Sequence, residues 1–400
     1  MSPSTFPDRP AARCWAEIDL SALRSNVRFC RDLAGPGCGL MAIVKADAYG
    51  HGLPETVRAL SQDGTKWFGV ANLKEARQIR EVLGDRGASI LVLSPATPDE
   101  IPSVVAGGFS GSVSSVGEVN EYASAARELG REARLHAVAD TGMGRMGSLA
   151  DDFAALVKHV LDTSGCRLEG VETHMPSADE EPDFTVEQIA AFRTLLESVE
   201  LPPGCLVHLG NSAGLLGFQD QCAFASLARP GLALYGISPL AGVGRDLQPV
   251  LTLKTRVTLV RQVPEGTTIS YGRTFVAGHP MRVATLGVGY GDGYPRHLSG
   301  READVLVAGQ RCRLLGRVTM DQIVVDVSHL PDPVARGDEV VLIGRQRDSL
   351  ITAGEIAEKA GTIPWEILTG ITSRVERTYF GAGTYTRSTM DPKSASKRRL

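Results

Sequence analysis

The sequence predicts a (β/α)8 barrel of the TIM type, followed by a smaller all-β domain. In the first 240 residues, eight short apolar and β-branched runs alternate with longer stretches rich in Ala, Leu, Glu and Arg. Beyond about residue 245, strand-like runs follow one another at short spacing, separated by Gly, Pro and Asp. Alternating strands and helices imply parallel strands joined by right-handed crossovers. Eight such strands at this chain length favour a closed barrel, with a doubly wound open sheet as the alternative.

The barrel strands are expected at the eight apolar runs. They span 40–45, 67–71, 89–93, 111–115, 135–140, 168–174, 205–210 and 231–236. Helices are expected between them wherever apolar residues recur at helical spacing. The clearest cover 73–85, 116–130 and 148–162, and Ser148 is the expected N-cap of the last.

The second half of the chain shows the alternation and turn residues of short antiparallel strands. Strand-like runs cover 251–263, 264–272, 282–295, 303–318, 322–328 and 338–345. One Ala- and Glu-rich segment, 352–361, predicts a helix. We therefore divide the chain into a flexible N-terminus (1–14), a barrel (15–245), a β domain (246–382) and a polar, disordered tail (383–400).

Composition narrows the class of protein. The 400 residues include 42 Lys and Arg and 46 Asp and Glu, which gives a net charge of −4. The chain therefore lacks the overall excess of basic residues that is typical of nucleic-acid-binding proteins. The sequence has neither an apolar run of the roughly 18 residues needed to span a membrane nor a secretory signal. None of the 7 cysteines stands in C-x-x-C spacing, so we expect no metal site and a reducing, cytoplasmic setting.

The segment AIVKADAYGHG (42–52) is the most informative motif. Lys45 ends a strongly apolar strand, and the active sites of barrels lie at the carboxyl ends of their strands. A partly buried amine has a lowered pKa and acts as a nucleophile or base. The alternative is a lysine that simply leaves the core for solvent.

Three further motifs follow predicted strands. His174 in THMPSADE is either a site residue or a structural histidine. Asn211, Ser212 and Gly214 in HLGNSAG form either an anion cradle at a helix start or a plain N-cap. Arg229 in LARPGLALYG stands at the entry to the last predicted strand. It is either an arginine near a bound phosphate or a surface arginine.

The segment GMGRMG (142–147) matches the G-x-G-x-x-G pattern of dinucleotide-binding loops. It follows the fifth strand, however, and no acidic residue at the tip of the next strand is available for a ribose hydroxyl. We therefore interpret Arg145 in this loop as a ligand for a carboxylate at the barrel mouth.

In this order, VKADAYGHG, DTGMGRMG, THMPSADE, GNSAG, ARPGLALYG, SYGRTF, GYGDGYPR and GRVTMDQ resemble the alanine racemase family, from about Trp15 to Tyr379. The resemblance implies a homodimeric enzyme of fold-type III that uses pyridoxal 5'-phosphate, with a barrel and a C-terminal β domain. It also implies that the strand at 14–20 belongs with the β domain.

The resemblance assigns residues to roles. Lys45 would form the internal aldimine with pyridoxal phosphate, and Lys45 and Tyr271 would be the two catalytic bases, with Tyr271 reaching the active site of the partner subunit. His174 would lie against the cofactor ring, and Arg229, supported by His208, would bind the pyridine nitrogen. The other cofactor-binding residues would be Tyr49, Asn211, Ser212, Gly231, Leu232 and Trp365. Substrate-binding or entry residues would be Arg145, Met320, Asp321, Tyr290 and Arg296.

These residue types suit racemisation, in which one base removes the α-proton and a second returns a proton to the opposite face. His174 is the candidate for tuning the phenol of Tyr271, whose reference pKa is near 10. The implied function is the interconversion of L- and D-alanine, which supplies D-alanine for peptidoglycan.

The sequence departs from the family pattern at two positions. Val138 stands where the family usually has a lysine, often carbamylated, that pairs with the arginine matching Arg145. Trp365 stands where the family has a phosphate-contacting tyrosine. These departures leave open a racemase of other amino acids such as serine, or a weakly active cofactor-binding relative. A fold-type III decarboxylase and a dinucleotide oxidoreductase are further alternatives.

Overall fold

The computed structural model describes residues 12–84, 87–381 and 386–387. Most of the predicted flexible N-terminus and of the predicted disordered tail lies outside these residues. The chain forms two compact units. We call Ser21–Gln248 the barrel unit, and the segments before Ser21 and from Pro249 onward the β unit.

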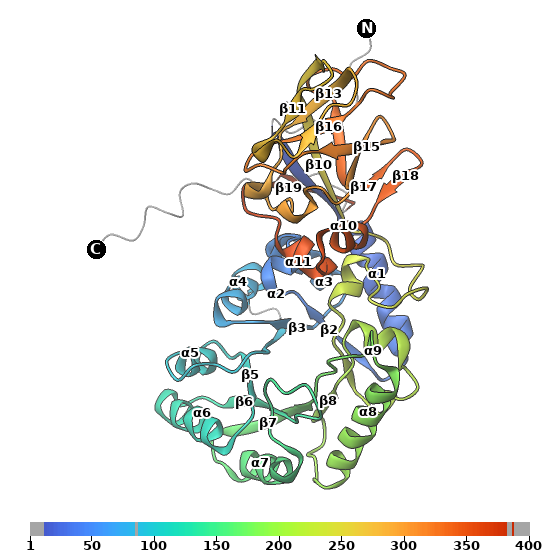
Figure 1. The fold of residues 1–400 in the computed structure, drawn as a ribbon. Helices are drawn as coiled ribbons and strands as arrows, with labels where there is room; N and C mark the ends of the chain where they lie inside the picture. The colour runs from blue at the N-terminus through green and yellow to red at the C-terminus, as the bar shows by residue number, and fades with distance from the viewer. Residues whose placement is uncertain (1–11, 85–86, 382–385, 388–400) are drawn as a thin grey trace, which may run out of the picture. The chain divides into compact units, whose positions relative to one another are not determined.

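The barrel unit contains eight parallel strands that close on themselves in sequence order, which confirms the predicted barrel (Figure 1). The strands are β2 (Gly39–Ile43), β3 (Trp67–Val70), β4 (Ser89–Val92), β5 (Ser110–Val113), β6 (Ala133–Val138), β7 (Cys166–Glu172), β8 (Leu206–His208) and β9 (Leu227–Ala228). Closure occurs where Gly39 and Leu40 of β2 pair with β9. The barrel thus has no free sheet edge, and every strand end is fixed by two neighbours.

Helices follow the strands, and the longer ones cover the outside of the barrel (Figure 1). They are α1 (Leu20–Ala34), α2 (Lys45–Tyr49), α3 (Leu53–Gln62), α4 (Leu73–Leu83), α5 (Ile101–Ala106), α6 (Val116–Leu129), α7 (Ala150–Asp162), α8 (Pro182–Glu197) and α9 (Ser212–Gly217). Side-chain caps start three of them, because Asn72 accepts the amide of Glu75, Ser115 accepts that of Glu118 and Asn211 accepts that of Gly214.

Two local predictions for the barrel are wrong. The run 231–236 is not the eighth strand: Leu232–Tyr235 form a 3-10 helix, η1, and the strand is the two-residue β9 before Pro230. Arg229 therefore follows the last strand rather than entering it. Ser148 does not cap α7, because its backbone bridges to Ala139 and the N-cap is Leu149, which makes no side-chain cap.

The β unit is built around a ten-stranded sheet. Its order is β18-β17-β14-β15-β16-β13-β10-β1-β19-β20, and β17 also pairs with β10. The strands are β1 (Cys14–Asp19), β10 (Leu251–Val263), β13 (Met281–Leu286), β14 (Asp304–Val307), β15 (Gln310–Leu315), β16 (Ile323–Asp326), β17 (Glu339–Gln346), β18 (Ser349–Ile351), β19 (Glu376–Phe380) and β20 (Thr386–Arg387). β1 lies between β10 and β19, so the first strand of the chain belongs to this unit.

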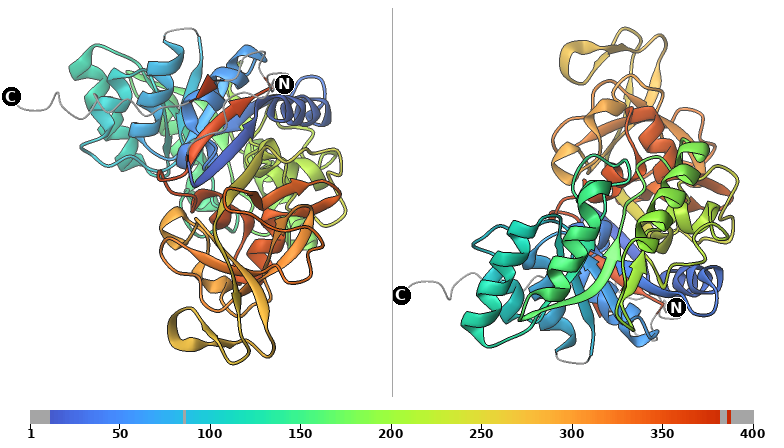
Figure 2. Two further views of the ribbon diagram at one scale, coloured as in Figure 1. Left: turned by 90° about the horizontal axis from the view of Figure 1, so that it is seen from above. Right: turned by 90° about the horizontal axis from the view of Figure 1, so that it is seen from below.

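Short elements complete the β unit. They are the hairpin β11 (Thr268–Ile269) and β12 (Phe275–Val276), the helices α10 (Ala353–Ala360) and α11 (Pro364–Thr369), and the 3-10 turns η2 (Tyr271–Arg273), η3 (Tyr290–Asp292) and η4 (Arg296–Leu298). The gold hairpin extends from the rest of its unit in both views of Figure 2. Its base packs on a cluster of buried apolar residues that includes Val263, Ile269 and Leu315.

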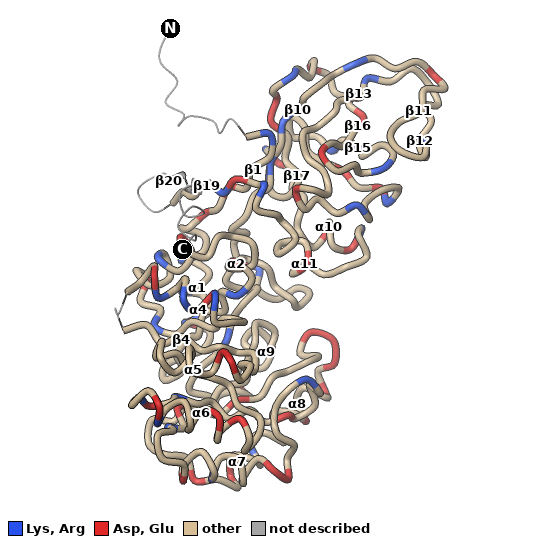
Figure 3. Tube along the Cα trace, turned by 90° about the vertical axis from the view of Figure 1, so that its left-hand side faces the viewer, with Lys and Arg blue, Asp and Glu red and all other residues tan. Residues whose placement is uncertain are grey.

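Charges of both signs are interspersed along both units (Figure 3). None of the helices in the described part of the chain has the length and apolar character of a membrane span.

Candidate active site

Lys45 follows β2 at the carboxyl end of the barrel and opens an unusual turn. Ala46, Asp47, Ala48 and Tyr49 all have φ of 53° or 54°, so α2 is one turn of left-handed helix. Each such residue costs about 1–2 kcal/mol relative to the right-handed conformation. The sequence pattern did not reveal this turn, because Ala normally favours a right-handed helix.

Hydrogen bonds from outside the turn hold it. Glu75 on α4 accepts the amide of Ala46 at 2.8 Å and that of Ala71 at 2.8 Å. The carboxylate of Asp47 accepts the amide of Leu53 at 2.7 Å. Lys45 is thereby fixed between a barrel strand and a braced turn. Sequence reasoning missed Glu75, although its place three residues after the capping Asn72 is a recognisable signal.

The amine of Lys45 is half-buried among positive charges. Burial is the largest cause that lowers the pKa of this amine. The guanidinium of Arg145 and, less strongly, that of Arg229 lower it further, whereas the carboxylate of Glu75 raises it. A lysine with a lowered pKa supplies more neutral amine near neutral pH, which is the form that attacks a carbonyl or accepts a proton.

Arg229 is buried at 4% exposure, beyond the end of β9. It pairs with Glu172 at 3.1 Å and donates to Nδ1 of His208 at 2.6 Å and to the carbonyl of Thr173 at 2.6 Å. Burial lowers its pKa, and Glu172 counteracts that effect. Glu172, which sequence reasoning did not single out, thus keeps a charged guanidinium in the barrel interior.

His174 lies beside Arg229, whose second guanidinium nitrogen donates to its Nδ1 at 3.2 Å. Burial, then Arg229, Arg145 and Lys45 lower the pKa of His174 to about 3. The imidazole is therefore neutral near neutral pH, with its proton on Nε2 because Nδ1 accepts.

A cradle of small residues follows β8 and β9. The carbonyl oxygen of the Asn211 side chain caps α9 by accepting the amide of Gly214 at 3.0 Å. Ser212 Oγ accepts the amides of Gly231 at 3.0 Å and Ala233 at 3.1 Å, which joins α9 to the start of η1 at Leu232. Of the two alternatives for HLGNSAG, the structure shows the N-cap by Asn211. The hydroxyl of Ser212 holds the segment after β9, through the amides of Gly231 and Ala233.

Gly231 borders the same cradle. A Cβ at this position would collide with the hydroxyl of Tyr49, whose ring stacks on Tyr235 with centroids 4.8 Å apart. The absent side chain leaves room beside the Tyr49 hydroxyl, and burial raises the pKa of that phenol, so it stays protonated and can donate.

The loop after β6 contains Arg145, which is exposed and makes no ion pair with any described residue. The carboxylate of Asp140 accepts the amides of Gly142 at 2.9 Å and Gly144 at 3.1 Å. In a dinucleotide-binding loop such amides would donate to a phosphate, but here they donate to the carboxylate of Asp140. Val138, 4% exposed, ends β6.

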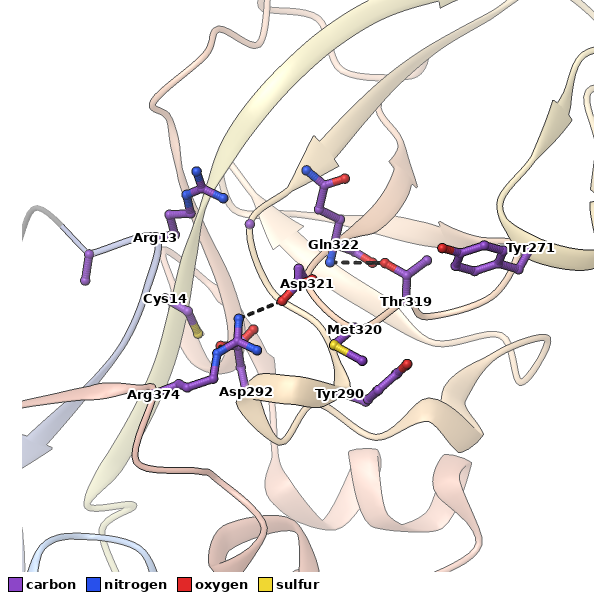
Figure 4. Close-up of a pocket in the computed structure, with 12 residues that line it drawn as sticks. Arg13, Cys14, Tyr271, Tyr290, Asp292, Thr319, Met320, Asp321, Gln322 and Arg374 are labelled. Carbon is purple, nitrogen blue, oxygen red and sulfur yellow. Dashed lines mark hydrogen bonds and ion pairs between the residues drawn. The ribbon is translucent and has the colours of Figure 1, made fainter.

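The remaining predicted residues lie in the β unit. Tyr271, Tyr290, Met320 and Asp321 line one cavity of about 780 Å³ (Figure 4). Asp321 is bound by Arg374 at 2.7 Å, a lining residue that sequence reasoning missed. 

Tyr271 is 72% exposed and begins η2 at the tip of the hairpin. It stands between Ser270 and Gly272, which have φ of 66° and 71°, so the chain turns sharply on either side of the ring. Trp365 is half-buried on α11, and Arg296 starts η4. The structure thus divides the predicted residues into a barrel set and a β-unit set.

The barrel set fits pyridoxal phosphate. Lys45, Arg145 and Arg229 bring three cationic side chains to the carboxyl end of the barrel, which suits an anionic ligand, and the space at Gly231 adjoins the hydroxyl of Tyr49. A half-buried lysine with a lowered pKa, a buried arginine and a glycine-lined cradle at the carboxyl end of a (β/α)8 barrel are the features expected of a barrel enzyme that binds pyridoxal phosphate through a lysine.

Comparisons with known proteins agree. The model of the alanine racemase N-terminal domain matches residues 18–239, and that of the alanine racemase C-terminal domain matches residues 250–379. The chain belongs to the alanine racemase family. It is 40% identical over 382 residues to an alanine racemase of Halothermothrix orenii, covering 91% of this chain and 96% of that relative.

Solved structures give the same result. The alanine racemase of D-cycloserine-producing Streptomyces lavendulae is 38% identical, with a TM-score of 0.85 over 94% of this chain and 98% of that one. The alanine racemase of Bartonella henselae, solved with covalently bound pyridoxal phosphate, is 28% identical, with a TM-score of 0.84 over 93% of this chain and 100% of that one.

Proposed function

We propose that this chain interconverts L- and D-alanine, using pyridoxal phosphate held at the carboxyl end of the barrel. The amine of Lys45 is the observation that supports this most directly: it is half-buried, has a lowered pKa and stands beside two guanidinium groups. Its setting suits covalent capture of the cofactor and binding of an amino-acid carboxylate. Membership of the alanine racemase family supplies the reaction.

The cofactor would be held by residues from several strand ends. Lys45 would bind it covalently, Arg229 would bind the pyridine nitrogen, and His174 would lie against the ring. The phosphate would be bound by Tyr49, Asn211, Ser212, Gly231, Leu232 and Trp365. When bound, the cofactor withdraws electrons from the α-carbon of the amino acid and so acidifies the α-proton.

The proton transfers would be shared by two side chains. Lys45 exchanges a proton at one face of the α-carbon, and its lowered pKa makes the neutral amine accessible. The hydroxyl of Tyr271 exchanges a proton at the opposite face. Because an arginine carries a permanent charge, Arg229 would donate a hydrogen bond to the pyridine nitrogen without giving up its proton.

Arg145 would bind the substrate carboxylate, since a guanidinium takes a carboxylate through two parallel hydrogen bonds. Met320 and Asp321 would lie near the substrate, and Tyr290 would line the entry. 

We further propose a homodimer in which Tyr271 of each copy serves the site of the other. Tyr271, Met320 and Tyr290 are 72%, 51% and 41% exposed around one cavity, an unusual exposure for large apolar side chains gathered together (Figure 4). A second copy that covers this surface would bury them. The D-alanine would serve peptidoglycan synthesis in the cytoplasm, in keeping with 7 free cysteines among the described residues.

Exchange of the α-proton in heavy water, followed by proton NMR, tests the reaction. Protein loaded with pyridoxal phosphate is incubated with L-alanine and, in parallel, with L-serine and L-lysine. Fastest loss of the alanine signal, with formation of D-alanine, supports the proposal. Faster exchange with serine or lysine, or exchange with none of the three, contradicts it.

Mixing two inactive variants tests the shared site. Lys45→Ala and Tyr271→Phe homodimers are combined in equal amounts and allowed to exchange subunits. Half the dimers become mixed, and one of their two sites keeps both bases, so about a quarter of the wild-type activity should return. No recovery after exchange would mean that both bases come from the same chain.

A further inference from the structure

A row of buried polar side chains leads from Arg229 through the barrel interior. His208 on β8, His136 on β6 and Glu169 on β7 are 0%, 0% and 6% exposed. Arg229 meets Nδ1 of His208 at 2.6 Å, Nε2 of His208 meets Nδ1 of His136 at 2.7 Å, and Nε2 of His136 meets Glu169 at 3.4 Å. The strands that supply them are neighbours in the barrel (Figure 1).

A β-bulge brings Glu169 into this row. In the pairing of β6 with β7, Leu135 is opposite Leu168 but His136 is opposite Gly170, so Glu169 is the extra residue. Side chains three positions apart on a regular strand point to opposite faces. Because of the bulge, Glu169 and Glu172 both face the interior, where they accept hydrogen bonds from Ser110 and Ser112 of β5.

The donor groups in the row fix the direction of its hydrogen bonds. A guanidinium has no acceptor, so Nδ1 of His208 must accept from Arg229. Burial first, then Arg229 and His136, lower the pKa of His208 well below its ordinary value, which leaves one proton on the ring, at Nε2. That proton points at Nδ1 of His136, which therefore accepts and keeps its own proton on Nε2, facing Glu169.

Glu169 is suited to end the row as an anion. Burial raises the pKa of its carboxyl, but hydrogen bonds from His136 and Ser110, with the charge of Arg134, bring the pKa below the ordinary value. Its second oxygen lies 3.8 Å from the guanidinium of Arg167. An oxygen of Glu169 that accepts from Nε2 of His136 is compatible with the tautomers that Arg229 imposes.

The ring of His136 is also fixed by packing. A Cβ on Gly170 would overlap its Nδ1 and Cε1 atoms, so the absence of a side chain there makes room for the imidazole. Trp67 on β3 meets the ring edge-on with centroids 5.8 Å apart, and His208 does so at 4.9 Å. The ring therefore has a defined orientation as well as a defined tautomer.

We propose that His136 and Glu169 are positioning residues that lock His208 in its Nε2–H tautomer and so hold the guanidinium of Arg229 in place. Neither touches the residues assigned to cofactor or substrate; both act through His208. The effect on catalysis rests on the proposed function, which gives Arg229 the pyridine nitrogen, whereas the tautomer lock is a property of the barrel itself.

The lock is measured on protein free of pyridoxal phosphate. The full chain is perdeuterated, labelled with 15N-histidine and studied by long-range 1H–15N NMR, and each resonance is assigned by single histidine substitutions. We expect His208 and His136 both as neutral Nε2–H tautomers at neutral pH. An Nδ1–H tautomer at His208, or a charged ring there, would overturn the proposal.

Two variants of one residue separate positioning from mere packing. Glu169→Gln keeps an acceptor for His136, whereas Glu169→Met removes it at similar volume. In the Met variant, we expect mixed tautomers at His136 and His208 and a changed visible absorption of bound pyridoxal phosphate. We also expect kcat to fall about tenfold with KM little changed. In the Gln variant, the wild-type tautomers and spectrum should persist.

If the Met variant does not fold, His136→Phe replaces it, because it removes the acceptor for His208 but keeps an aromatic ring against Trp67. Unchanged tautomers, spectrum and kcat in the variants that lack the acceptor would overturn the proposal. So would mixed tautomers without a change in spectrum and kcat. Loss of racemase activity in the wild type together with the expected NMR result would instead refute the proposed function and leave the lock standing.

Discussion

Replacing Glu172 with Gln tests whether the barrel depends on its buried ion pair. Glu172 and Arg229 are 5% and 4% exposed and lie 3.1 Å apart. At an effective dielectric constant near 20, two unit charges at this distance attract by about 5 kcal/mol. Gln keeps the volume and an acceptor for the hydroxyl of Ser112, so the substitution removes mainly the charge.

The expected loss is about 3 kcal/mol of unfolding free energy. Removing one partner of a buried pair costs roughly 3–5 kcal/mol, because the other charge is left buried without compensation. The lower end applies here, since the guanidinium of Arg229 also donates to the carbonyls of Thr173 and His208. Equilibrium urea unfolding of cofactor-free protein measures the loss.

An exposed pair provides the matched control. Lys158 and Asp162 lie 2.6 Å apart on α7, with side chains 76% and 62% exposed. Asp162→Asn should cost less than about 1 kcal/mol, because water screens this pair. A loss below 1 kcal/mol for Glu172→Gln as well would refute the reasoning. Adding Arg229→Met to Glu172→Gln should recover part of the lost stability, because no unpaired charge then remains.

Three further substitutions test the site. Gly231→Ala should weaken pyridoxal phosphate binding by about 1–3 kcal/mol in a fluorescence titration, because its methyl group would displace the hydroxyl of Tyr49; unchanged affinity would contradict this. Glu75→Ala should speed hydrogen exchange at the amide of Ala46, which loses its acceptor, and no faster exchange would mean that the turn is held by other contacts. For His174, the folded-state pKa of about 3 lies below the ordinary 6.5, so the unfolded chain binds the extra proton and stability falls as pH decreases below 6.5. Between pH 7.5 and 5.5 this removes about 1.4 kcal/mol, and His174→Gln should lose that much less over the same interval in urea unfolding.

The elements that were predictable are those in which local and tertiary preferences agree. The segment 251–263 alternates apolar and polar residues, and β10 spans Leu251–Val263. The helix expected at 352–361 is α10, which Thr352 caps by accepting the amide of Glu355 and which ends at Gly361 with φ of 73°. In such segments periodicity and end signals point to the same structure.

The predictions that were wrong fall where backbone pairing overrides side-chain pattern. The apolar run 231–236 has strand character, but Pro230 and the turn at Gly231 end the sheet, and the buried 3-10 turn η1 accommodates the same residues. Ser148 has an N-cap residue type, yet its amide and carbonyl bond to Val138 and Asp140, which places it before the helix.

Site residues were predictable where motif and strand end coincide, as at Lys45 and Arg229. Their supporting partners were not. Glu169 is in place only because of a one-residue bulge, which no periodicity reveals, and the left-handed turn after Lys45 contradicts the preference of Ala. Both features depend on contacts between segments far apart in the sequence.

The structure of the barrel explains how Val138 is accommodated at the position where the family usually has a lysine. An unpaired arginine is costly where it is buried, and Val138 offers Arg145 no partner charge. In the structure, the side chain of Arg145 is exposed, and the loop that holds it is braced by Asp140, which accepts the amides of Gly142 and Gly144. The backbone of this loop therefore keeps its shape without an anion at position 138. Val138 itself is buried at the end of β6, where an apolar side chain is stabilising. The barrel thus tolerates valine there because the loop is braced by backbone amides rather than by the side chain at that position.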